Sequence, residues 1–483
     1  MLFNSLDFIF FFPIAVIIYY VLSHKHRWAW LLGCSYYFYM QWDITLVLLL
    51  ITSTLIDYFC GMKMYKSTNQ SIRKTYITIS VVANLGMLFF FKYLGFFSES
   101  ISDVMAYFGS TVELDGEGLG FSYGNILLPV GISFYTFQTL SYSIDVFRGK
   151  IEPERHLGKY ALYVAFFPQL VAGPIERASR LLPQFYKKIE LDIPEIRKGI
   201  ILMSWGFFLK MVVADRLGVY VDHVHGDPSA TPGLPLIIGM YLFGFQIYYD
   251  FSAYSIIAVG AAKVLGFDLM NNFNRPFYSA NSTQFWQRWH RSLMQWLRDY
   301  LYKPLTRNLK LSISVSLLLV FFINGLWHGA NWTFVVWGLL CAIFLILERA
   351  TLSFRNKLVD ALPFNVSHKM RNILWGAVTI SFLCFSLILF RSSSIENAFR
   401  YIYHMFHINA FYFNILNDLF EIVLIIICIL FVQIVHFYKG NDKIYELFSS
   451  NNIAVRWSLY VLFISIMVLF AFNRQNSFIY FQF

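Results

Sequence analysis

Long apolar runs recur along this chain and set its hydrophobic pattern. A bilayer core of about 30 Å needs about 20 helical residues per crossing, and the runs are of that order. Twelve of them are candidate spans, near residues 6–22, 28–41, 43–59, 76–97, 125–147, 199–214, 236–262, 311–327, 331–348, 374–391, 418–437 and 456–472. We therefore predict an all-α polytopic membrane protein, folded as a single membrane domain over residues 1–483.

One further apolar segment, residues 160–173, differs from the others. It contains Pro168 and ends at Gly173, which is followed by another proline. A segment of this length is short for a crossing, and proline interrupts a helix. We expect a re-entrant or interfacial piece that enters and leaves on one side of the membrane.

Charges in the loops predict how the spans alternate across the membrane. Lysine and arginine gather in residues 63–74, 174–198 and 271–310, whereas residues 98–118 hold five acidic residues and no basic one. The loop 215–235 has one arginine. Since cytoplasmic loops are rich in lysine and arginine, the first three segments are expected in the cytoplasm, and the last two, with both termini, outside.

Composition excludes an ordinary water-soluble fold. The chain is 58% hydrophobic, 20% aromatic and only 14% charged, with a mean hydropathy of +0.55, whereas soluble domains carry about a quarter charged residues. The net charge of +10 comes from short loops, so it favours the lipid bilayer as partner and argues against nucleic acid. The five cysteines have no CxxC spacing, so neither a disulfide framework nor a zinc site is expected from them.

Residues 281–305 form the first candidate region for chemistry. Placed on one continuous helix, this stretch puts arginines on one stripe and His290 on the apolar side with Trp286. Asn281 is a capping residue and Pro304 a natural stop. The arginines either rest on lipid headgroups or hold an anionic, phosphate-rich donor. The candidates for donor binding or tunnel lining here are Trp286, Arg288, Trp289 and Arg291.

Residues 321–348 form the second region, centred on His328. This histidine lies between two apolar runs with Gly325 and Gly329 on either side. A polar side chain at membrane depth is costly unless it faces a protein interior or a cavity, so it marks a candidate functional site. The alternative is a histidine hydrogen-bonded to its own helix for packing. Further candidates for lining the site are Asn324, Trp327 and Asn331.

The two Trp-His pairs suggest a shared chemistry. Six of the twelve tryptophans fall within residues 286–337, more than an interfacial aromatic belt explains. A partly buried imidazole is neutral and can accept a proton. A neutral imidazole in a water-poor passage could take a proton from a hydroxyl or thiol as a thioester is attacked. We expect His328 to be this general base, or briefly the acyl carrier, and His290 to orient or polarise the donor. His223 and His225, near two aspartates, are either a weak metal site or a solvated loop.

Both regions resemble the membrane-bound O-acyltransferase family, in particular the bacterial branch for O-acetylation of alginate, peptidoglycan and cellulose. The resemblance covers essentially the whole chain. The motifs that carry it are QFWQRWHRSLMQWLRDYLYKPL, NGLWHGANWTFVVWG, LLPVGISFYTFQTLSYSIDVFRG, FFPQLVAGPIERASRLLPQF, NFNRPF, the opening MLFNSLDFIFF and the ending FIYFQF.

Membership of that family implies a ring of helices around a central tunnel, with His328 essential for acyl transfer and His290 as its second polar partner. The resemblance implies no bound cofactor, acetyl-CoA or another acyl thioester as donor, and a location in the bacterial inner membrane. It also implies a periplasmic SGNH-type transferase as partner and an extracytoplasmic polysaccharide as acceptor. Two alternatives remain at this point: D-alanyl transfer to teichoic acid from a carrier protein, and a transporter of a glycan or lipid.

Overall fold

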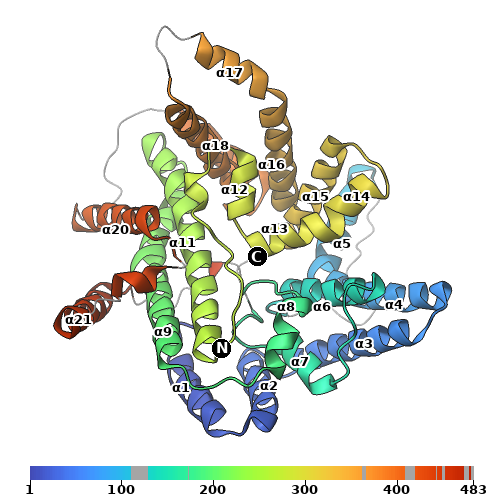
Figure 1. Ribbon diagram of the computed structural model, residues 1–483. Helices are drawn as coiled ribbons and strands as arrows, with labels where there is room; N and C mark the ends of the chain where they lie inside the picture. The colour runs from blue at the N-terminus through green and yellow to red at the C-terminus, as the bar shows by residue number, and fades with distance from the viewer. Residues whose placement is uncertain are drawn as a thin grey trace. The chain divides into compact units, whose positions relative to one another are not determined.

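The structure is a computed structural model that describes residues 1–109, 129–171, 173–361, 366–407, 419–441, 443–448, 452–472 and 478–479. Within these ranges the chain is helical and contains no β-strand (Figure 1). The predicted outer loop 98–118 is therefore described only as far as residue 109, and the FIYFQF ending only at Phe478 and Ile479.

The chain divides into two compact units, residues 1–193 with 265–269, and residues 194–264 with 270–483. The helices of the first unit are α1 (Leu6–Val21), α2 (His24–Met40), α3 (Leu46–Lys66), α4 (Gln70–Leu88), α5 (Leu94–Tyr107), α6 (Ile132–Phe147), α7 (Leu157–Ala165) and α8 (Ala178–Leu181). A π-helical turn, Phe89–Tyr93, joins α4 to α5. The predicted short segment 160–173 lies on α7 and the turns that follow it, and α7 is too short to cross a membrane.

A buried carboxylate joins three helices of the first unit. Asp57 on α3 is fully buried, and its oxygens accept hydrogen bonds from Ser80 Oγ (2.5 Å) and Asn84 Nδ2 (2.9 Å) on α4. Ser143 Oγ on α6 donates to the same carboxylate at 3.1 Å. A buried charge is tolerated only when it is hydrogen-bonded, so this network fixes how α3, α4 and α6 pack.

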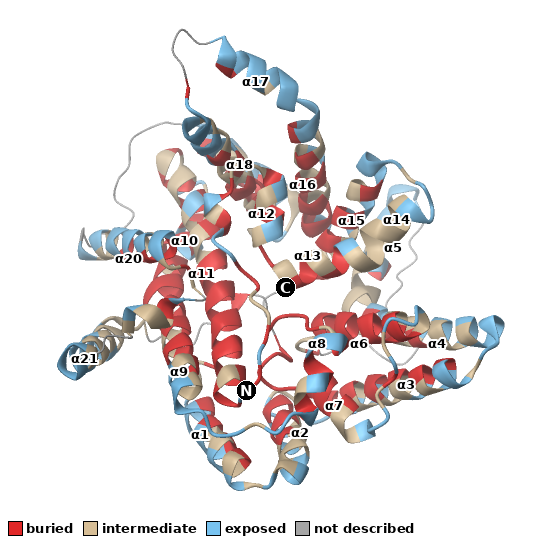
Figure 2. Ribbon diagram, viewed as in Figure 1, coloured by how far each residue is buried: buried red, intermediate tan, exposed pale blue. Residues whose placement is uncertain are grey.

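The second unit is built around α11 (Leu234–Val264), which is buried along most of its length (Figure 2). The other helices are α9 (Ile193–Phe207), α10 (Asp215–Gly226), α12 (Ser282–Arg288), α13 (Arg291–Leu297), α14 (Lys303–Arg307), α15 (Ile313–His328), α16 (Trp332–Ala350), α17 (Leu352–Asp360), α18 (His368–Arg391), α19 (Ile395–Phe406), α20 (Leu419–Tyr438) and α21 (Ile453–Phe470). Both α10 and α18 pack directly against α11.

The loop predicted at residues 215–235 is wrong in its first half, because residues 215–226 form α10. A π-helical turn, Phe208–Ala214, carries the chain from α9 into α10 without a break. Lys210 in that turn forms an ion pair with Asp215 (Nζ to Oδ1, 2.9 Å). Asp215, one of the polar residues that indicate a loop in the sequence, therefore pairs with a buried cation.

Seven helical segments among the described residues are long and apolar enough to cross a membrane: α3, residues 70–107, α11, α16, α18, α20 and α21. The apolar helices α1 and α15 are shorter, at 16 residues each. Each of the twelve predicted spans overlaps a helix over its described part. The prediction of an all-α polytopic membrane protein is confirmed.

Candidate active site

The crossing of α15 and α16 places His328. Glycines lie where the two helices touch: a Cβ atom on Gly325 would come within 2.3 Å of the carbonyl oxygen of Phe334, and one on Gly338 within 2.2 Å of the carbonyl oxygen of Phe321. Only glycine permits so close an approach of two backbones. His328 is the last residue of α15, so this contact between the helices fixes the position of its backbone.

Aromatic rings surround the His328 imidazole. Its ring centroid lies 4.9 Å from that of Trp327, 5.1 Å from Trp337 on α16 and 5.2 Å from Phe390 on α18. The residue is 6% exposed and lines a cavity of about 30 Å³. The cavity wall is formed by Gly244, Ile247, Phe277, Phe285, Trp286, Trp289, His328, Trp337, Leu383, Cys384, Ser386, Leu387 and Phe390. His328 is therefore a polar group in a mostly apolar cavity.

The continuous helix predicted over residues 281–305 is wrong, because the chain breaks at His290. Helix α12 ends at Arg288, and α13 begins at Arg291. His290 itself adopts the left-handed conformation (φ 41°, ψ 54°), which is strained for a residue with a side chain. The single arginine stripe expected across this stretch therefore does not form.

The NFNRPF segment holds this break in place. The backbone N–H of Arg291 donates to the carbonyl oxygen of Asn272 at 2.8 Å, and that of Asn274 donates to the carbonyl oxygen of Arg288 at 2.9 Å. These bonds satisfy backbone groups that the interrupted helix leaves free. The predicted cap is present, since Asn281 Oδ1 accepts from the N–H of Gln284. The predicted stop is wrong: Pro304 lies in the first turn of α14, where its missing N–H is tolerated.

Trp327 connects the two histidines. Its ring centroid lies 5.6 Å from that of His290 and 4.9 Å from that of His328. His290 is only 1% exposed, and Phe251 of α11 meets it edge to face at 4.7 Å. Both histidines inferred from the sequence therefore lie next to one indole ring.

The family model of the membrane-bound O-acyltransferases matches residues 31–395. The chain belongs to this family. It is thus an enzyme, an O-acyltransferase, and the family and enzyme class predicted from the sequence are confirmed.

Relatives of this O-acyltransferase come from several bacteria. A probable alginate O-acetylase of Pseudomonas aeruginosa is 34% identical, over 86% of this chain and 77% of the relative. A peptidoglycan O-acetyltransferase of Helicobacter pylori is 29% identical over 100% of this chain and 98% of its own length. A teichoic acid D-alanyltransferase of Bacillus subtilis is 28% identical over 55% of this chain and 69% of the relative.

The remaining predicted site residues of the acyltransferase divide into two groups. Trp286 and Trp289 line the His328 cavity, and the indole N–H of Trp286 has no hydrogen-bond partner among the described residues. Neither Arg288 nor Arg291 lines this cavity, and Arg288 Nη1 donates to the carbonyl oxygen of Tyr278 at 2.8 Å. The tryptophans, but not these two arginines, therefore form the cavity in this structure.

The two asparagines also differ. Asn324, one turn before His328, is 1% exposed, and its amide has no hydrogen-bond partner within the described ranges. Buried amides in native folds are usually hydrogen-bonded, so Asn324 is open to a bound water or ligand. Asn331 instead caps α16 by accepting from the N–H of Thr333 (2.9 Å), while its Nδ2 donates to the carbonyl oxygen of Ser393 (3.0 Å). Asn331 thus serves as a structural tether.

Glu348 is a positioning residue that the sequence analysis missed. Its carboxylate accepts from the backbone N–H of Ser282 at 2.8 Å and from the hydroxyl of the same serine, and also from Thr379 Oγ1 at 3.1 Å. It therefore joins α16 to the start of α12 and to α18, three helices that line the cavity. The sequence does not indicate this role, because a glutamate at the end of an apolar run is typical of an ordinary helix terminus.

A second group that the sequence analysis missed is centred on Asp250, the residue before Phe251. Asp250 is buried, pairs with Lys210 Nζ at 2.7 Å, and accepts from the backbone N–H of Ile479 at 2.7 Å. Phe478 stacks on Tyr254 with centroids 4.6 Å apart. The described part of the FIYFQF ending is thus packed beside the residues that contact His290. Charges within apolar runs were the signal that could have indicated this group.

No group of three or more His, Cys, Asp or Glu side chains suited to a metal occurs in the part of the chain that the structure describes. His223 and His225 lie on α10, not in a loop as expected.

We expect Gly338→Ala to destabilise the α15–α16 crossing by about 1–3 kcal/mol and to lower activity, because the new Cβ would collide with the backbone of Phe321. The measurement is the melting temperature in detergent together with acyl-transfer rate. Gly33→Ala is the matched control: no atom lies within 4 Å of its added Cβ on α2, so its melting temperature should stay the same or rise. Equal behaviour of the two variants would contradict the tight crossing.

We expect stability to fall in acid partly through His290. Burial lowers the pKa of His290 from 6.5 to about 3, so between these values the unfolded state binds a proton that the folded state does not. The free energy of unfolding should therefore decrease by about 1.4 kcal/mol for each pH unit lost below 6.5. Melting temperatures of the wild type and His290→Asn, which tolerates the left-handed backbone, should diverge as pH changes. Identical pH profiles would count against a neutral buried imidazole.

Proposed function

We propose that this chain moves an acetyl group from cytoplasmic acetyl-CoA across the bacterial inner membrane for O-acetylation of an extracytoplasmic polysaccharide. The observation that carries the proposal is the His328 imidazole in an apolar-walled cavity. The names of the relatives from Pseudomonas aeruginosa and Helicobacter pylori supply the acetyl group and the class of acceptor, alginate-like or peptidoglycan.

In the proposed reaction, neutral His328 acts as general base. It accepts the proton of the attacking hydroxyl, which the partner transferase supplies, while the new C–O bond forms at the acetyl carbonyl carbon and the C–S bond of the thioester breaks. The protonated imidazole then returns the proton to the leaving thiolate, which departs as free CoA. General-base catalysis of this kind contributes about 100- to 10,000-fold. His290, whose ring also lies next to Trp327, helps to orient or polarise the donor.

Donors for the developing oxyanion are also present in the cavity wall. The indole N–H groups of Trp286 and Trp337 have no hydrogen-bond partner among the described residues, and both rings line the cavity. Preorganised N–H donors in a dry site stabilise such charge strongly. The cavity of about 30 Å³ is large enough to hold a water molecule.

A periplasmic SGNH-type transferase is the proposed partner that completes transfer to the polymer. The alternative of D-alanyl transfer is weaker, because the teichoic acid enzyme aligns with only 55% of this chain. A transporter is disfavoured by the family, and the buried carboxylates Asp57 and Asp250 are held by neighbouring groups.

The test is acetyl transfer by the purified full-length chain in sealed proteoliposomes, with radiolabelled acetyl-CoA on the side of its cytoplasmic face and the candidate partner and polysaccharide on the other side. Release of CoA with label on the polymer is expected. Labelled acetyl-imidazole trapped by acid quench would make His328 the acyl carrier in place of a base. No release of CoA with any partner, and transfer of D-alanine from a carrier protein, would each overturn the proposal.

A further inference from the structure

A second pocket of the same unit is polar and lies at the end of α18. It encloses about 290 Å³ between the C-terminal end of α10 and the junction of α18 with α19. Its lining residues are Asp222, His225, Gly226, Asp227, Pro228, Arg391, Ser392, Ser393, Asn397, Arg400 and Tyr401. Binding sites for small molecules begin at about 300 Å³, so the pocket has room for one small polar unit.

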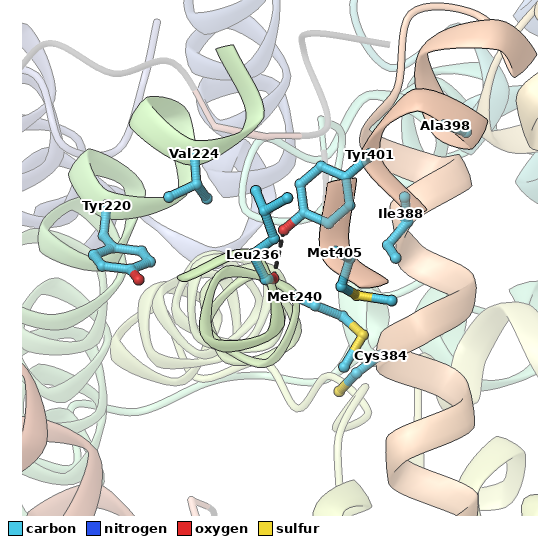
Figure 3. Packing of buried hydrophobic residues seen from close by; sticks show 9 residues of the cluster. All are labelled: Tyr220, Val224, Leu236, Met240, Cys384, Ile388, Ala398, Tyr401 and Met405. Carbon is cyan, nitrogen blue, oxygen red and sulfur yellow. Dashed lines mark hydrogen bonds between the residues drawn. The ribbon is translucent and has the colours of Figure 1, made fainter. Parts of the chain in front are cut away.

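A hydrophobic cluster beside this pocket holds its walls in place (Figure 3). Side chains from α10, α11, α18 and α19 pack together, and Tyr401 Oη donates to the carbonyl oxygen of Leu236 at 2.7 Å. The cluster consists of Tyr220, Val224, Leu236, Met240, Cys384, Ile388, Ala398, Tyr401 and Met405. Because its walls stand on packed helices, the pocket is preorganised.

Arg400 and Asp227 are the two charged side chains of the pocket for which no ion pair within 4 Å occurs among the described residues. Arg391 Nη2 pairs with Asp222 Oδ1 at 2.7 Å. Asp227 accepts from the N–H and the hydroxyl of Ser229, bonds that lower its pKa, with a smaller contribution from Arg400. Arg400 is exposed and forms no ion pair within 4 Å among the described residues. An anionic group is the natural ligand for its guanidinium.

His225 adds an acceptor. Its Nδ1 lies 3.0 Å from the carbonyl oxygen of Val221; a carbonyl only accepts, so Nδ1 carries the proton and Nε2 does not. Nε2 has no hydrogen-bond partner in the described part of the chain. Burial, helped by Arg391, lowers the pKa of His225 to about 4, so the ring is neutral at physiological pH. An unprotonated buried nitrogen is complemented by a hydroxyl donor.

A chain connection and a hydrogen bond link the pocket to the His328 site. Phe390, whose ring contacts His328, is followed directly by Arg391 of the pocket. Asn331 tethers the loop after His328 to Ser393, another pocket residue. The pattern of loop charges predicts residues 215–235 on the outer side, where an extracytoplasmic acceptor would arrive.

We propose that this pocket binds an acidic sugar unit of the acceptor, with its carboxylate on Arg400 and its hydroxyls on His225 and Asn397. This identification of the ligand as acceptor rests on the proposed function, whereas binding itself does not depend on any acyl donor. A sugar acid supplies both an anion for the Arg400 guanidinium and a hydroxyl for His225 Nε2, neither of which has such a partner among the described residues.

The experiment measures binding to the full-length chain in nanodiscs of zwitterionic lipid, without acyl donor. The probes are a short oligo-hexuronate, a neutral oligoglucoside of the same length, and an acidic peptide. We expect the oligo-hexuronate to bind best, and Arg400→Gln to weaken it about tenfold or more. His225→Phe, which keeps an aromatic ring but removes Nε2, should also weaken it.

Arg197→Gln is the matched control, since Arg197 is an exposed arginine of α9 outside the pocket. Equal binding of the two sugars, equal binding of the acidic peptide, or unchanged affinity in Arg400→Gln would each overturn the inference. Acetyl-CoA consumption is measured separately on the wild type. If the chain binds the sugar but does not consume acetyl-CoA, only the proposed function is contradicted. If it consumes acetyl-CoA but does not bind the sugar, only the assignment of this pocket is contradicted.

Discussion

Replacing His328 by alanine should abolish acetyl transfer while the protein still folds and inserts. The imidazole lies in an apolar-walled cavity beside Trp337 and Phe390, and no other side chain that lines this cavity is a base of similar strength. A loss of about 100- to 10,000-fold in rate is expected, measured as label transferred from acetyl-CoA to polymer. Truncating a buried side chain also leaves a small void, so the melting temperature must be measured beside the rate.

The control for this variant is His368→Ala, which removes an exposed histidine at the start of α18. Its rate and melting temperature should match those of the wild type. Transfer that persists in His328→Ala at more than about a tenth of the wild-type rate would exclude this imidazole as general base and as carrier.

Lys210→Met should produce the largest loss of stability. Lys210 Nζ lies 2.9 Å from Asp215 and 2.7 Å from Asp250, and the three side chains are 8%, 4% and 4% exposed. Removing the cation leaves two carboxylates buried near each other, and breaking such a buried pair costs about 3–5 kcal/mol. The measurement is the melting temperature of the purified chain in detergent. The N–H of Ile479, which donates to Asp250, should become more accessible to hydrogen exchange.

Neutralising the aspartates should reverse the effect. The triple variant Lys210→Met, Asp215→Asn, Asp250→Asn removes every charge of the group and should recover much of the lost melting temperature, since the desolvation cost of the ions disappears with them. Lys188→Met is the surface control, because its ion pair with Glu190 is largely exposed and contributes little. If Lys210→Met melts like the wild type, the ion group does not stabilise this unit.

Local pattern accounts for much of what was predicted correctly. The positions of the spans follow from hydropathy, because a helix in lipid must satisfy its own backbone hydrogen bonds and present apolar side chains. His328 stood out because a histidine between glycines in an apolar run is costly without a purpose. The Asn281 cap was also readable, since capping involves residues only three apart.

The helix break at His290 could not be predicted from the residues around it. Residues 281–305 have helical periodicity throughout, and the left-handed turn is held by hydrogen bonds from the distant NFNRPF segment. The same holds for Phe390, which reaches His328 from another helix, and for Arg400 and His225, which share a pocket only because α10 and α19 both pack against α11.

The sequence by itself determined the membrane-spanning helices, the family and the two histidines, since these depend on residue type and short spacing. Only the tertiary structure decided which side chains enclose His328, how His290 is turned towards Trp327, and where Lys210 finds its aspartates. The physical reason is that burial and pairing energies arise between residues far apart in the chain, and no local periodicity records them.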